Sequence, residues 1–486
     1  MVGWMMGLFL LTGAGFEDPQ PADTVVRQAV VAVDSAGVDT LTDRTFSVAR
    51  VIITGNKVTK RRIIERELTL KPGDTIRARR LHSELEWDKN KLYNLRLFNT
   101  VSVRALDAGN NQIDILVDLT ERWYIFPVPI FELSDRNFNE WWNNYNHDLT
   151  RINYGVRVYK YNFRGRNETL RLTAQFGFYR KFDLQYKIPN LDRSQKHGLT
   201  FSFDFAAPRN LAYQTVDHKL EFLRKENVVK ESIGGGITYS YRKTFFETHS
   251  FTYNYRASDV IDTILYLNPN YNNLSKTTQR YSQLSYHFVS EHRDVVMYPL
   301  RGYQFTAYVA KSGLLPQEDV DQLEVNVTYA YHKPIATNYF FSNFSSVFWS
   351  TPMNQPYTLF DALGYRNLII RGFENYVVEG PAFALNKMTF KRKLFGKSWR
   401  IDKMPVEQFN YFPLAIYFKT FVDFGYVHNY DYYQEKNLNT RLSNRFLLGA
   451  GAGLDVVTVY DLVLRLEYTY TQDARWGFFL NARKEF

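Results

Sequence analysis

The chain has 486 residues with no cysteine, 17% aromatic residues and a formal net charge of +10 at pH 7. The lack of cysteine excludes disulfides, thiol catalysis and thiolate metal sites, and we expect no nucleic-acid partner because the basic residues form no stripe or long run. The length exceeds that of a typical single domain, and a chain that is both aromatic and polar is typical of strands with one apolar and one wet face.

The N-terminal segment has the pattern of an export signal. Residues 1–16 combine an apolar core with small residues after it, as in a secretory signal peptide, although the usual positive charge before the core is missing. Residues 17–46 contain Pro19, Pro21 and scattered aspartates without a firm periodicity, which predicts a linker. No other apolar run approaches the ~18 residues of a membrane helix, so the chain is either soluble or crosses a membrane as strands.

Residues 47–122 predict a small α+β domain. The expected order is a strand, two helices and two strands, over residues 47–55, 59–70, 79–95, 101–106 and 113–119. The second helix carries a stripe of leucines on one face, and turn residues separate the two last strands. This order indicates a compact module with its own core.

From about residue 150 the chain repeats long alternating strands. Apolar and polar side chains alternate in LRLTAQFGF (170–178), and the same phase recurs in 323–331 and 462–471. A soluble β-sandwich also alternates, but its strands average ~5–6 residues, whereas these reach the ~9–11 residues that span a bilayer. The predicted fold is mainly β: a sixteen-stranded antiparallel transmembrane β-barrel over 123–486, with about sixteen strands by counting hairpins, preceded by the α+β domain.

The order of these elements and several motifs resemble the outer-membrane assembly barrel family, the BamA/TamA-like surface-antigen barrels. The module 47–122 is similar to a single POTRA domain of that family. The matching segments are Gly55-Asn56, ELTLKPGD (67–74), NLRLFNTVSV (94–103), YNFRGRNE (161–168) and EHRDVVMYPLRGY (291–303). The resemblance implies a location in the outer membrane of a Gram-negative bacterium, with the POTRA domain in the periplasm.

The most specific part of the resemblance is the long connection 351–387, which we place between the eleventh and twelfth strands. In the family this loop folds into the barrel lumen with an Arg-Gly-Phe motif at its tip, and Ile370, Arg371, Gly372 and Phe373 match it. The resemblance therefore implies that Arg371 points at an acidic partner on the inner wall, since a partly dehydrated guanidinium must be paired.

Strand parity nominates the partner of that arginine. In YFKTFVDFG, Phe418 and Val422 face lipid, which turns Asp423 inward. Asp455, inward on the next strand, is expected to help. The family's second acidic residue is replaced here by Thr389.

The segment FLLGAGAGLD places Gly449, Gly451 and Gly453 on the inner face of the same strand as Asp455. They predict a smooth wall against which the loop backbone packs. As a phosphate-binding fingerprint, GAGAG would need a following helix, which is not expected. The chain ends in a strand whose outward residues include Trp476, Phe478 and Phe486, which resembles the sorting signal of outer-membrane barrels.

No catalytic or metal-binding motif stands out, and Ser290 and His292 share one strand face without a relay, so we expect no enzyme, cofactor or metal. The resemblance implies an assembly and insertion factor that templates client β-barrels at a lateral seam between the first strand, expected at 150–161, and the last, at 475–486. Its implied partners are unfolded outer-membrane client proteins, periplasmic accessory lipoproteins, membrane lipids and lipopolysaccharide. A secretion translocator that exports a partner polypeptide through the barrel, as in two-partner secretion, and a passive pore remain open.

Overall fold

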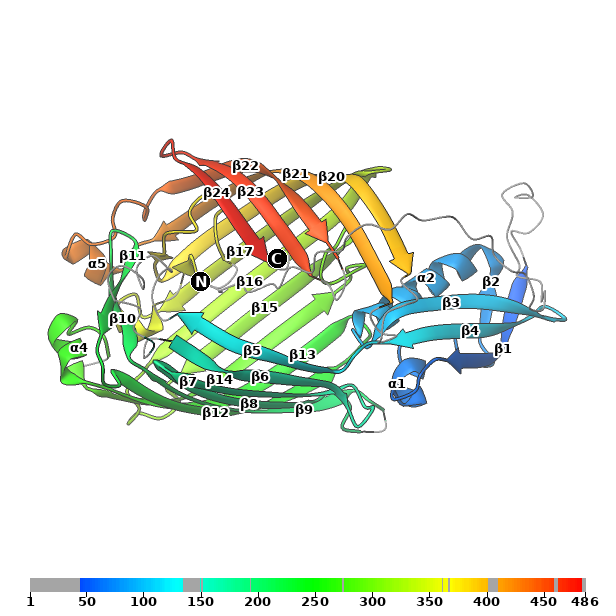
Figure 1. Ribbon diagram of the computed structural model, residues 1–486, viewed down its shortest axis with the longest axis horizontal. Helices are drawn as coiled ribbons and strands as arrows, with labels where there is room; N and C mark the ends of the chain where they lie inside the picture. The colour runs from blue at the N-terminus through cyan, green and yellow to red at the C-terminus, as the bar shows by residue number, and fades with distance from the viewer. Residues whose placement is uncertain are drawn as a thin grey trace.

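The structure, a computed structural model, describes residues 44–133, 149, 152–192, 194–272, 275–360, 362–365, 368–400, 410–458 and 462–482. The expected signal peptide 1–16, nearly all of the expected linker and the terminal Phe486 lie outside these residues. Figure 1 shows a small module beside one large curved sheet. Among the described residues, no helix has the length and apolar character needed to cross a bilayer.

The N-terminal module contains a four-stranded sheet in the order β2-β1-β4-β3. Its elements are β1 (Thr45–Thr54), α1 (Arg61–Glu65), β2 (Thr75–Arg77), α2 (Ala78–Asn94), β3 (Phe98–Gly109) and β4 (Gln112–Glu121). The expected order is confirmed, with two differences: α1 has five residues, and β2 was not anticipated. The chain leaves α1 early because the buried Asp88 carboxylate accepts the Thr69 amide at 2.9 and 3.0 Å, which fixes an irregular segment after the helix.

The large sheet has sixteen strands in chain order and all of its neighbouring pairs are antiparallel, which confirms the predicted fold class. The first eight strands are β5 (Ile125–Leu133), β6 (Ile152–Phe163), β7 (Glu168–Gly177), β8 (Tyr179–Ile188), β9 (His197–Pro208), β12 (Lys230–Arg242), β13 (Glu247–Val260) and β14 (Thr278–Glu291). The other eight are β15 (Gly302–Ser312), β16 (Gln322–Ala336), β17 (Tyr339–Thr351), β20 (Ala382–Arg400), β21 (Tyr411–His428), β22 (Phe446–Val457), β23 (Val463–Thr471) and β24 (Trp476–Ala482).

The strands separate an apolar outside from a polar inside. Along β21, Phe418 and Val422 are exposed, while Lys419, Phe421 and Asp423, which have the opposite parity, are buried. The alternation has the two-residue period of a strand, and it repeats the inward and outward assignment made from the sequence.

The first strand of the sheet was placed wrongly from the sequence. The sheet begins with β5 (Ile125–Leu133), and the segment assigned as the first strand forms the second, β6. Two prolines, Pro127 and Pro129, obscure the strand pattern, because proline is tolerated in a sheet mainly on an edge strand. β5 and β24 are the two ends of the sheet, and no ladder joins them within the described residues (Figure 1).

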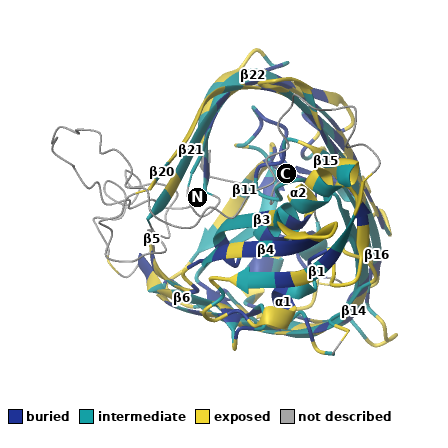
Figure 2. Ribbon diagram, turned by 90° about the vertical axis from the view of Figure 1, so that its right-hand side faces the viewer, coloured by how far each residue is buried: buried dark blue, intermediate teal, exposed yellow. Residues whose placement is uncertain are grey.

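The N-terminal module lies across one mouth of the barrel, as Figure 2 shows. The side-chain amide of Asn94 at the end of α2 donates to the Asp294 carbonyl at 3.0 Å, and its oxygen accepts the Val296 amide at 3.2 Å. The Lys60 amide donates to the Gly165 carbonyl at 2.9 Å. The turns β14–β15 and β6–β7 thus hold the module in place, and they are two of the segments that carried the family resemblance.

The other end of the barrel is covered by a group of short elements that we call the distal cap. Its members are β10 (Asn210–Val216), β11 (Lys219–Arg224), α4 (Asp262–Leu267), η3 (Tyr357–Leu359), β18 (Ala362–Leu363), β19 (Val378–Glu379) and α5 (Asp431–Glu435). In Figure 1 the labelled members β10, β11, α4 and α5 lie at the end opposite the module.

Candidate functional site

The connection between β17 and β20, the eleventh and twelfth strands of the sheet, enters the barrel at the predicted place. We call residues 352–381 the inner loop. A two-residue ladder between β18 and β19 forms its stem, and the Phe373 amide donates to the Ile370 carbonyl at 3.0 Å in a turn at its tip. Gly372 has φ of 102°, which only glycine adopts without strain, so the turn depends on it.

Arg371 and Asp423 meet at the tip of the inner loop, as strand parity indicates. The guanidinium donates two bonds to the carboxylate, Nε to Oδ2 at 2.8 Å and Nη2 to Oδ1 at 2.5 Å, and the Arg371 amide adds a third at 3.0 Å. Asp423 is fully buried, and Arg371 is 8% exposed. This is a bidentate, charge-assisted pair in a dehydrated site, which is the strongest kind of ion pair when its hydrogen bonds are complete.

Two further groups complete the surroundings of the guanidinium. Thr389 accepts a hydrogen bond from Arg371 Nη2 at 3.1 Å, so the residue that replaces the family's second acid still serves as an acceptor. The guanidinium carbon lies 3.9 Å from the centre of the Phe421 ring, which adds a cation–π contact. Glu467 on β23 lies 3.9 Å from Nη1. The sequence assigned Glu467 to the polar face of its strand but did not identify it as a neighbour of Arg371.

Asp455 was wrongly expected to help hold Arg371. Its carboxylate pairs with Lys419 Nζ at 2.6 Å and accepts the Tyr298 hydroxyl at 2.9 Å. The register shows why: Asp423 faces Gly449, and Asp455 lies six residues further along β22, about 20 Å at ~3.3 Å per residue. Parity gives the side of a strand but not the height along the barrel.

Lys419 forms ion pairs with both Asp455 and Glu467 on the inner wall of the barrel. Its ammonium lies 2.6 Å from Asp455 and 2.7 Å from Glu467, and all three side chains are at most 4% exposed. Because Glu467 also neighbours Arg371, one connected set of charges runs along the inner wall from the motif to the turn that carries Tyr298. We call Arg371, Asp423, Lys419, Glu467 and Asp455 the lumen charge network.

The predicted glycine wall contacts the loop at one of its three positions. A Cβ on Gly449 would lie 2.0 Å from the Arg371 carbonyl oxygen, so only glycine allows this approach. At Gly451 and Gly453 the nearest atoms come from β21 and β23, so these two do not form the predicted packing surface for the loop. Gly425 on β21 takes that place instead, because a Cβ there would lie 2.3 Å from the Ile370 side chain.

Apolar packing fixes the rest of the motif. Ile370 and Phe373 are 2% and 5% exposed and belong to one buried cluster with residues of β18, β19 and the barrel wall. At the end of the chain, Trp476 and Phe478 lie on the outer face of β24, 64% and 67% exposed. That outward orientation is the one expected of a sorting signal, whereas Phe486 lies outside the described residues.

The distal cap is held together around the imidazole of His218, in the β10–β11 turn. Its Nε2 accepts the Leu442 amide at 2.9 Å, its own amide donates to Asn439 at 2.8 Å, and its carbonyl accepts the Val377 amide at 2.9 Å. Burial, together with the nearby Arg441, lowers the pKa of His218 to about 4. The neutral ring therefore joins the hairpin to the loop after α5, and the backbone carbonyl of His218 joins it to the inner loop.

Acidification is expected to loosen the distal cap. The unfolded state binds a proton at His218 near pH 6.5, whereas the folded state does so near pH 4. The contribution of this residue to the free energy of unfolding is thus complete above pH 6.5. It falls by on the order of 3 kcal/mol as the pH is lowered to 4. The thermal midpoint of the wild type minus that of His218→Gln, which keeps an acceptor and cannot titrate, should fall over this range. A pH-independent difference would contradict the assignment.

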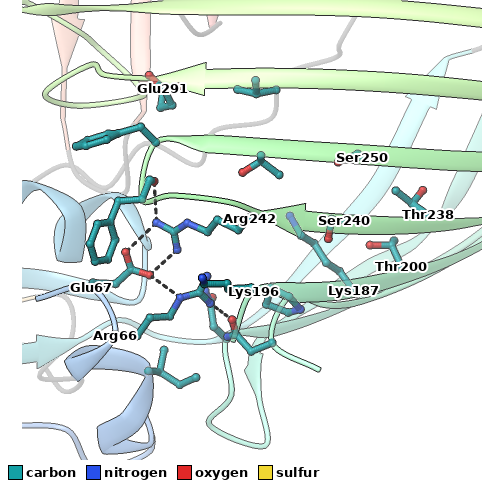
Figure 3. Close-up of a pocket in the computed structure, with 18 of the residues that line it drawn as sticks. Arg66, Glu67, Lys187, Lys196, Thr200, Thr238, Ser240, Arg242, Ser250 and Glu291 are labelled. Atoms are coloured by element: carbon teal, nitrogen blue, oxygen red, sulfur yellow. Dashed lines mark hydrogen bonds and ion pairs between the residues drawn. The ribbon is translucent and has the colours of Figure 1, made fainter. Parts of the chain in front are cut away.

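A cavity of about 560 Å³ separates the module from the barrel mouth, and Figure 3 shows its charged lining. Arg242, at the end of β12, donates two bonds to the buried Glu67 of the module, at 2.6 and 2.9 Å. Arg66 lies 3.6 Å from the same carboxylate. Burial, with Arg242 close by, lowers the pKa of Arg66 to about 10. This cluster is a third point of attachment between the module and the barrel.

Arg242→Ala is expected to weaken this attachment by roughly 2 kcal/mol, because Glu67 would lose two charge-assisted hydrogen bonds while still buried. Amide hydrogen exchange of the module should speed up near α1, with barrel protection unchanged. Lys243→Ala is the matched control, since the side chain of Lys243 is 62% exposed and its ion pair with Glu247 is long, at 3.8 Å. Equal exchange in the two variants would show that the cluster does not hold the module.

Among the described residues, no three His, Asp or Glu side chains gather in a way that could hold a metal ion.

Comparison with known proteins agrees with the fold. Residues 162–478 match the family described as Omp85 superfamily domain, and residues 46–122 match POTRA, described as surface antigen variable number repeat. BamA from Haemophilus ducreyi lacking POTRA domains 1-3 superimposes with a TM-score of 0.50 at 15% identity, covering 90% of this chain and 83% of that one. CdiB from Escherichia coli gives 0.50 at 10% identity, with 90% and 74% covered. No curated protein sequence matches the chain.

Proposed function

This chain belongs to the Omp85 superfamily, whose β-barrels with POTRA domains are outer-membrane proteins of Gram-negative bacteria, and we propose that it assembles other barrels into that membrane. It templates the folding of client strands at the seam between β5 and β24. The role is mechanical, without a catalytic group, cofactor or metal.

The observation that carries this proposal is the pair of strand edges at the seam. In the described part of the chain, β5 pairs with β6 alone and β24 with β23 alone. A backbone N–H or C=O without a hydrogen-bond partner in hydrocarbon costs several kcal/mol, about as much as any unpaired buried polar group. The seam therefore favours the addition of an extended strand by β-augmentation.

The remaining surfaces fit the same role. With the module in the periplasm, the edge strand β3 offers a second place where an unfolded client or a periplasmic lipoprotein adds a strand. The exposed outward aromatics, such as Phe418 and Phe478, meet lipid and lipopolysaccharide. The inner loop and the lumen charge network keep the wall formed by β21, β22 and β23, beside the seam, in a fixed shape.

A secretion translocator is the second candidate, and the interior of the barrel favours it. A cavity of about 610 Å³ is lined by polar groups from the inward faces of several strands, among them Asp204, Arg256, Gln283 and Glu324. A polypeptide in transit would need such a polar path. However, the module covers one mouth and the inner loop and distal cap fill the other end, so export would require both to move.

Depletion of the protein tests the assignment. The folded fraction of other outer-membrane barrels, read from heat-modifiability on gels, should fall before growth stops if the protein is an assembly factor. Unchanged barrels with one missing extracellular polypeptide would favour export. Unchanged barrels together with ion conductance in planar bilayers would identify a passive pore.

A further inference from the structure

The backbone of β5 has a fixed hydrogen-bond phase against β6. The Tyr161 amide donates to the Tyr124 carbonyl at 2.8 Å, and the register continues from there along β5 without a shift. In an antiparallel ladder, residues that exchange hydrogen bonds alternate with residues whose N–H and C=O point away from the partner strand. The even-numbered residues of β5 therefore bond to β6, and the odd-numbered ones face the free edge.

Two of the free-edge residues are prolines. Pro127 and Pro129 have no N–H, so the edge keeps donors at Ile125 and Phe131 and has none between them. At ~3.3 Å per residue this gap spans about 20 Å, which is a large part of the bilayer thickness crossed by the strand. Proline on an edge strand is one of the devices that keep other strands from pairing there.

The free edge of β24, by comparison, keeps all of its backbone N–H and C=O groups. The Thr471 amide donates to the Arg475 carbonyl at 3.0 Å, and the register from this bond turns the odd-numbered residues of β24 toward β23. Trp476, Phe478 and Leu480 therefore present both N–H and C=O to the free edge, and no proline interrupts β24. The two sides of the seam differ in donors and not in acceptors.

We propose that the free edge of β24 is the surface on which a client strand docks, and that Pro127 and Pro129 prevent pairing along the middle of β5. This inference rests on the proposed function. The partner is an extended segment of an unfolded outer-membrane protein, antiparallel to β24 and alternating in polarity. Its apolar side chains continue the outer surface formed by Trp476, Phe478 and Leu480, which are 60–67% exposed, and its polar ones face the lumen.

The donor gap also weakens direct closure of the barrel. If β5 paired with β24, each proline would leave one hydrogen bond of the ladder unmade, although its carbonyl could still accept. The prolines thus keep the β24 edge available instead of letting the barrel seal itself.

Seam spacing tests this part without any client. The chain contains no cysteine, so nitroxide labels on Ile125→Cys and Leu480→Cys report on β5 and β24 alone. Replacing both prolines with valine should raise the population at the short spacing of paired strands roughly tenfold, the size expected of two net hydrogen bonds. An unchanged distance distribution would overturn the role of the prolines.

Matched proline substitutions test which edge receives the client. Phe478 on β24 and Phe131 on β5 are 67% and 64% exposed, and both direct their N–H to a free edge. The probe is a urea-unfolded eight-stranded outer-membrane barrel added to liposomes that contain each variant. Phe478→Pro should slow folding of the probe about tenfold, whereas Phe131→Pro and Phe478→Ala should change it less than twofold. Equal losses in the two proline variants would overturn the assignment to β24.

The two experiments separate the inference from the function it rests on. If wild-type protein does not accelerate folding of the probe, the proposed function fails, while the label distances still decide whether the prolines hold the seam open. Phe479→Pro is the folding control, because its N–H points to β23 and its loss should break the β23–β24 ladder. Phe478→Pro counts only if its heat-modifiability equals that of the wild type, and the Phe478→Ala variant shows the effect of the side chain alone.

Discussion

Arg371→Ala is expected to destabilise the barrel by about 3–5 kcal/mol, because the fully buried Asp423 carboxylate would keep its charge without its main partner. The variant also loses the hydrogen bond to Thr389 and the contact with the Phe421 ring. The temperature at which the folded band disappears on gels should drop, and complementation of a depleted strain should weaken with it.

Three companion variants make this result interpretable. Arg371→Lys keeps the charge but cannot form the two-pronged bond, so an intermediate loss is expected. Arg371→Met combined with Asp423→Leu should be milder than Arg371→Ala, since neither member of the pair is left buried without the other. Arg256→Ala is the matched control: this lumen arginine is 54% exposed and 3.7 Å from Asp204, so its loss should cost less than ~1 kcal/mol. A folded band as stable as the wild type in Arg371→Ala, with full complementation, would refute the structural role of the motif.

Lys419→Met is expected to be at least as damaging as Arg371→Ala, although Lys419 lies outside the motif. The change leaves Asp455 and Glu467 buried at 1% and 4% side-chain exposure without the ammonium that lies between them. Breaking a buried pair costs about 3–5 kcal/mol, and here two pairs share one cation. Chemical unfolding in detergent, followed by tryptophan fluorescence, measures the loss.

Coupling within the lumen charge network gives a second readout. Glu467 neighbours both Lys419 and Arg371, so the double variant Lys419→Met with Arg371→Ala should cost less than the sum of the single ones. Adding Glu467→Gln to Lys419→Met should recover part of the stability. Lys311→Met, which removes an ion pair with the largely exposed Asp321, should change little. Strict additivity of the two lumen variants would mean that the charges act independently.

The sequence alone was sufficient for the architecture, the family and the position of the inner loop. Strand alternation has a period of two, so it assigned Asp423 to the inside of the barrel and Phe418 to the outside before any coordinates. The Arg371–Asp423 pair was predictable because a buried guanidinium needs a carboxylate and because the loop motif limited the search to neighbouring strands. Local pattern and one requirement for charge pairing were enough for that contact.

The alternation of inward and outward residues does not determine how far along the barrel axis a residue lies. Only the tertiary structure decided that position. The stagger of β21, β22 and β23 sets Asp455 against Lys419 and Tyr298, and it brings Glu467 to Arg371. The same stagger selects Gly449 and Gly425, and not Gly451 or Gly453, as the surface under the loop. β5 was missed for a related reason: its prolines are tolerable only on a free sheet edge, and which strand has a free edge is a property of the assembled sheet.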